Sequence, residues 1–123
     1  MPHLVFEGES DLERVFTGIP RGVHRWKTAV LKTENAWFRS DGLAVLVEGV
    51  VVEHSRAVHP VALIATARGA TSIRLWPLAP VERTPAVQRW LALLGYDVGR
   101  LENLPLRTTN VAQEILAGLE ISA

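Results

Sequence analysis

The stretch LAVLVEGVVVEHSRAVHPVALIATARGATSIRLWP, residues 43–77, decides the fold. It contains three apolar runs rich in β-branched residues, at 43–53, 61–67 and 70–76, and such runs are typical of β-strands. A polar loop at 54–60 separates the first two runs, and Arg68-Gly69 forms a tight corner between the last two. The stretch therefore predicts the centre of an antiparallel sheet.

From Leu43 to Val52 the first of these runs is apolar at almost every position, and Glu48 and Gly49 interrupt it. A strand of this kind is expected to be buried on both faces, by helices on one side and by further protein on the other. The simplest further protein is a second copy of the same chain. In the run 70–76, Ile73 and Leu75 alternate with Arg74 and Trp76, which predicts one core face and one amphipathic face.

Upstream of this centre, residues 4–6 predict an opening strand. Ser10 and Glu13 have the spacing of a capping box, and apolar residues at 12, 15, 16 and 19 predict a short helix that Gly18 and Pro20 end. Residues 26–32 predict a strand, 34–35 a turn or bulge, and 37–39 further extended chain. Ser40-Asp41-Gly42 predicts a hairpin turn.

Downstream, Thr84-Pro85 predicts the start of a second helix, with a capping threonine followed by proline at the first helical position. Gly95 is expected to end that helix. Residues 96–107 predict a short strand or an ordered loop. A third helix is expected after a capping box formed by Asn110 and Gln113, with a buried stripe at 111, 115 and 119.

This order of elements predicts an α+β fold in a single domain, residues 1–123. The expected architecture is one antiparallel sheet of four to six strands with three helices packed on one face, in the order β-α-β-β-β-β-β-α-α. A wound parallel fold requires a helix between most strands, and residues 26–77 leave no room for one.

Composition narrows the functional classes. The 123 residues include 13 basic and 13 acidic side chains, no cysteine, and 48% hydrophobic residues. Zero net charge disfavours duplex DNA binding, and the lack of cysteine excludes disulfides and thiolate metal sites. The sequence predicts a soluble cytoplasmic protein without a signal peptide or membrane span. The high apolar content favours burial of surface in a homodimer.

Four histidines are present, and two of them, His54 and His59, cluster with Glu53 around one loop. Their spacing gives at most part of a metal site, because structural metal sites usually use four ligands, so no metal is predicted. The glycine-rich motifs that bind phosphates are absent, and no cofactor is predicted.

A catalytic set is not evident in the sequence. His54 and His59 could act as general acid or base near neutral pH, and Glu48 is a carboxylate within the most apolar strand. With Arg74, these residues could line a pocket between sheet and helices in a small enzyme or ligand-binding protein. An ion pair is the plainer role for Glu48, and no serine has the setting of a nucleophile.

Arginine and tryptophan occur together in several segments, and the candidate ligand-binding residues are Arg25, Trp26, Trp37, Arg39, Arg74 and Trp76. An outward face formed by these side chains could stack bases of single-stranded nucleic acid or hold an aromatic ligand. The favoured alternative is that the tryptophans anchor the core and a protein interface.

Together these features favour a non-catalytic, homo-oligomeric α+β module that binds a protein partner or a small ligand. The small enzyme with a sheet–helix pocket and the single-stranded nucleic-acid binder are the alternatives.

Overall fold

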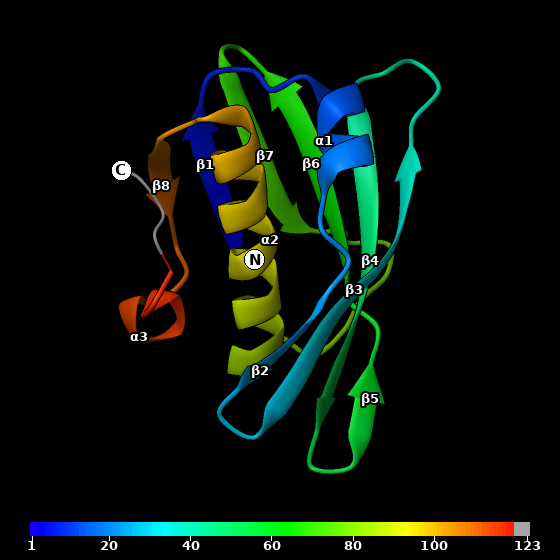
Figure 1. Cartoon of the computed structure of the whole chain (residues 1–123), viewed down its shortest axis with the longest axis vertical. Helices are drawn as coiled ribbons and strands as arrows, with labels where there is room; N and C mark the ends of the chain where they lie inside the picture. Colours follow the sequence, from blue (N-terminus) through cyan, green and yellow to red (C-terminus); the bar gives the residue numbers. More distant parts are fainter. Residues whose placement is uncertain (120–123) are drawn as a thin grey trace.

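A single curled antiparallel sheet forms the frame of the molecule in the computed structural model, which describes residues 1–119 (Figure 1). The strands are β1 (His3–Glu7), β2 (Val23–Trp26), β3 (Ala29–Phe38), β4 (Ala44–Glu53), β5 (Arg56–Val58), β6 (Val61–Ala67), β7 (Ala70–Leu75) and β8 (Leu106–Thr109). The helices are α1 (Leu12–Gly18), α2 (Pro85–Glu102) and α3 (Gln113–Leu116). The α+β class and the antiparallel sheet are confirmed.

The strands follow the order β2-β3-β4-β6-β7-β1-β8. The short strand β5 pairs with the last residues of β4, beyond the part of β4 that pairs with β6. Every paired neighbour is antiparallel. The sheet curls into a half-barrel around α2, with α1 on the same side near β3 and β4, and α3 against α2 (Figure 1). The predicted count of four to six strands is wrong, because the sheet has eight.

Two of the additional strands come from turns that the apolar pattern does not reveal. The predicted strand 26–32 is a hairpin instead, because Lys27 adopts a left-handed conformation with φ of 54° and reverses the chain between β2 and β3. In the expected loop 54–60, His54 and Ser55 form another reversal, and β5 pairs back onto β4. The predicted bulge after Thr33 is confirmed by a register shift between Thr33 and Ala36.

The second helix begins as predicted, with the Thr84 side chain accepting a hydrogen bond from the Val87 amide. Its predicted end at Gly95 is wrong, since α2 continues to Glu102 and ends at Asn103 in the left-handed conformation. Gly95 has a different role. A Cβ there would lie 3.0 Å from Leu4 Cδ2 of β1, so the glycine permits close packing of helix on sheet.

The two predicted capping boxes are also corrected. Asp11 caps α1 by accepting the Arg14 amide, while the Ser10 amide donates to the Thr71 hydroxyl. Near the C-terminus, α3 is a single turn with no side-chain cap. The Asn110 amide group instead accepts the His3 backbone N–H and donates to Met1 O, which ties this segment to β1.

The core lies between the sheet and α2. Alternate residues of β4, namely Val45, Val47, Gly49 and Val51, are buried beneath the helices, and Trp90 of α2 packs directly over Gly49. The intervening residues face away from the helices and are half-buried in the single chain, with Val52 37% exposed. Within the chain itself only the helix side of this strand is fully covered, so the expectation that further protein covers its other face stays a prediction.

Candidate functional site

The side of the sheet opposite the helices is here called the free face, and consists of the outward side chains of β3, β4, β6 and β7. Its central row crosses the strands as Trp37, Leu46, Leu63 and Arg74, which the sheet register places side by side. Trp37 is 51% exposed, whereas Leu63 is only 9% exposed because its neighbours surround it. The free face is thus an apolar strip that begins at an exposed indole.

Two charged groups lie at the edges of this strip. Glu48 projects from β4 and accepts a hydrogen bond from Asn35 Nδ2 at 3.4 Å. Arg74 projects from β7, two strands away across β6, and is exposed. The sequence suggested that Glu48 forms an ion pair, but within residues 1–119 it has no salt-bridge partner in the single chain.

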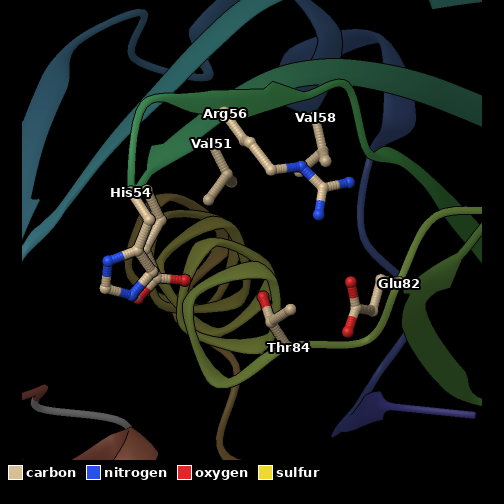
Figure 2. A pocket seen from close by; sticks show the side chains of 7 residues that line it. Val51, His54, Arg56, Val58, Glu82 and Thr84 are labelled. Carbon is tan, nitrogen blue, oxygen red and sulfur yellow. The ribbon is translucent and has the colours of Figure 1, made fainter.

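A second feature lies on the helix side, between the β4–β5 hairpin and the segment that leads into α2. This hairpin cleft has a volume of about 280 Å³. Its seven lining residues are Val51, Glu53, His54, Arg56, Val58, Glu82 and Thr84. Figure 2 shows the hairpin side chains on one side of the cleft and the side chains of Glu82 and Thr84 on the other.

Local backbone geometry places the polar groups of the hairpin. His54 and Ser55 have φ values of 52° and 63°, the pair of left-handed residues that a tight two-residue hairpin requires. This turn puts Glu53 and Arg56 directly opposite each other across the ladder. The Glu53 carboxylate nevertheless lies 3.9 Å from His54 Nε2, while the Arg56 side chain extends over the cleft toward Glu82 (Figure 2).

The four residues proposed from sequence for a sheet–helix pocket are not gathered in this cleft. His54 lines it, but His59 is not among its lining residues. Glu48 and Arg74 belong to the free face. Arg56 and Glu82 line the cleft and were missed, because residues so far apart in sequence are brought together only by the hairpin and the chain crossing before α2.

The tryptophan residues are likewise divided between the two sides of the sheet. Trp26 pairs with the buried Ala29 and lies on the helix side, where the guanidinium carbon of Arg89 is 5.7 Å from its ring centre. Trp37 lies on the free face, and Trp76 is half-buried just beyond β7. Arg25 is exposed on β2, and Arg39 pairs with Asp41 at 2.5 Å. Trp26 and Trp37 therefore do not share one stacking surface.

Another polar cleft, of about 310 Å³, lies between α2 and the end of α1. Asp97 of α2 lines it with a side chain only 18% exposed, and Arg100 is 4.0 Å away. Burial raises the pKa of the Asp97 carboxyl, and the positive charges of Arg100 and His24 partly oppose that increase.

Within residues 1–119, no group of three or more histidine, aspartate or glutamate side chains is arranged to hold a metal ion. None of the helices in this part of the chain is long and apolar enough to cross a membrane. No protein-family model, curated protein sequence or solved structure matches the chain.

Proposed function

We propose that this domain is a non-catalytic module that forms a homodimer by packing the free face of one copy on the free face of another. The observation that carries the proposal is the row of Trp37, Leu46 and Leu63 on a sheet face that no helix within residues 1–119 covers. A contiguous apolar surface of this kind usually marks an interface, and a half-exposed tryptophan is a frequent interface anchor.

The charges on the free face favour a second copy as the partner. A two-fold axis running along β6, between two stacked free faces, exchanges the β4 side with the β7 side. Arg74 of one protomer then lies over β4 of the other, level with Leu46 and two residues along the strand from Glu48, across sheets packed about 10 Å apart. An arginine and a glutamate side chain together span that gap. The arrangement gives two symmetric ion pairs beside an apolar centre.

Light scattering coupled to size exclusion tests the proposal. We expect the wild-type chain to be a dimer at micromolar concentration, and Trp37→Lys to be a monomer with an unchanged far-UV circular dichroism spectrum. Leu78→Lys is the matched control, because Leu78 is 77% exposed in the segment after β7 and lies outside the strip. A wild-type chain that remains monomeric at high concentration contradicts the proposal.

A charge exchange tests the geometry separately. Glu48→Arg and Arg74→Glu should each weaken dimerisation, since each single change places like charges opposite one another. The double variant should restore dimerisation toward the wild-type level. If the single variants dimerise as tightly as the wild type, the two-fold arrangement along β6 is wrong.

A further inference from the structure

The hairpin cleft is another place where the fold gathers charged side chains, and two of them have no partner in the described part of the chain. Arg56 has a carboxylate directly opposite it on β4, that of Glu53, yet its guanidinium extends away over the cleft (Figure 2). Glu82 faces it from the opposite wall (Figure 2). Among the described residues, neither Arg56 nor Glu82 takes part in an ion pair. The cleft thus holds Arg56 and Glu82, which do not pair with each other, beside Glu53 and His54, whose side chains lie 3.9 Å apart.

From this arrangement we propose that the hairpin cleft binds a small zwitterion, an α-amino acid with an aliphatic side chain. Its carboxylate would receive the planar fork of the Arg56 guanidinium, the geometry in which arginine binds carboxylates best. Its ammonium group would lie against Glu82, with Glu53 as a further carboxylate at the same cleft. A zwitterionic ligand can pair with Arg56 on one wall and with Glu82 on the other. A purely anionic ligand is repelled by Glu82, and a purely cationic ligand is repelled by Arg56.

The apolar residues that line the cleft are the reason for proposing an aliphatic side chain on the ligand. Val51 and Val58 face each other across the β4–β5 ladder and supply the apolar surface of the cleft. The volume of about 280 Å³ lies just below the roughly 300–1,000 Å³ typical of small-molecule sites. That size suits an amino acid and is small for a nucleotide.

Methyl NMR of the full chain tests the site with L-leucine as the probe. We expect saturable shifts of the Val51 and Val58 methyl resonances on titration. N-acetyl-L-leucine, which lacks the ammonium group, and L-leucinamide, which lacks the carboxylate, should each bind at least about tenfold more weakly, which corresponds to about 1.4 kcal/mol. Equal shifts with all three compounds, or no saturable shift at these two valines, overturn the proposal.

Two variants test which charged residue of the cleft binds which end of the ligand. Arg56→Gln should remove the preference for leucine over leucinamide, because the carboxylate loses its partner. Glu82→Gln should remove the preference for leucine over its N-acetyl derivative. Both residues are exposed, so both variants should fold. Arg68→Gln, at the exposed β6–β7 turn, is the control and should retain both preferences. Variants that keep the wild-type preferences contradict the assignment.

Ligand binding at the hairpin cleft should be independent of dimerisation, because the cleft opens on the helix side and the proposed interface is the free face. Leucine should therefore bind the monomeric Trp37→Lys variant with unchanged affinity. Loss of binding in that variant would show that the cleft depends on the dimer and would overturn the site as a property of the single chain.

Discussion

The two faces of this sheet differ although the same strands build them. On the helix side, Val47 and Val51 of β4 are buried, and Gly49 between them packs closely against Trp90. On the free face, the residues between them remain half-exposed. Close packing makes the helix side intolerant of small changes in volume, whereas the free face has room for them. Alternating valines in one strand therefore have unequal structural roles.

The largest expected effect comes from adding one methyl group on the helix side. In Gly49→Ala the new Cβ would overlap the Trp90 indole, so α2 must shift from the sheet. We expect a loss of about 3 kcal/mol in the free energy of unfolding, measured with urea. Val50→Ala, one residue along and on the free face, should lose about 1 kcal/mol. Equal losses would abolish the distinction between the faces.

A smaller effect should follow the loss of one hydrogen bond on the helix side. The Trp90 indole N–H donates to Thr33 Oγ1 at 3.2 Å, and Trp90 is 1% exposed. Thr33→Val preserves the shape and leaves the buried donor unpaired, so we expect a loss of about 1–2 kcal/mol. Thr28→Val, in the exposed β2–β3 turn, serves as the control in the same denaturation experiment. A similar loss of unfolding free energy in both variants would mean that the hydrogen bond between Trp90 and Thr33 makes no stabilising contribution of its own.

Asp97 introduces a pH dependence on the helix side. Burial raises the pKa of its carboxyl above the ordinary value of 3.8, so the folded chain keeps this proton to a higher pH than the unfolded chain does. The free energy of unfolding therefore decreases as pH rises from about 3.8 through the folded-state pKa. Asp97→Asn should flatten this part of the stability curve and slightly stabilise the chain at neutral pH. Wild-type and variant curves that run parallel across this range would contradict the prediction.

The smallest effect is expected at the end of β4 on the free face. Val52 is 37% exposed, and Val52→Thr should change the free energy of unfolding by less than about 0.5 kcal/mol. Its neighbour Val51 is 2% exposed on the helix side, and Val51→Thr should lose about 1–3 kcal/mol because it buries a hydroxyl group. Thermal unfolding of the two variants in parallel measures the contrast. If Val52→Thr loses as much as Val51→Thr, the end of β4 is not open in solution.

The parts of the fold that follow local rules were predictable from sequence. Thr84-Pro85 starts α2, and Asp41-Gly42 forms the β3–β4 turn, with Asp41 accepting the Leu43 amide. The failures have tertiary causes. Gly95 resembles a helix stop but serves contact with Leu4, and Lys27 reverses the chain although lysine has no special preference for that conformation.

The candidate sites show the same division. The polar segment containing His54 was recognisable from sequence as a loop, because it separates two apolar runs, but its β4–β5 hairpin was not predicted. The opposite wall of the cleft could not be predicted either, since the position of Glu82 depends on the path of the chain before α2. From the sequence, the free face could be anticipated only as an excess of apolar residues. The hairpin at Lys27, which determines which tryptophans lie on this face, was not predicted.

The position of β1 in the sheet affects how the chain folds. This strand lies between β7 and β8, with Leu4 opposite both Ile73 and Thr109. Both neighbours are far from β1 along the sequence, so β1 can pair only after the intervening chain has been brought back to it. Contacts between such distant residues slow folding, and they make completion of the sheet a late event in the folding of this domain.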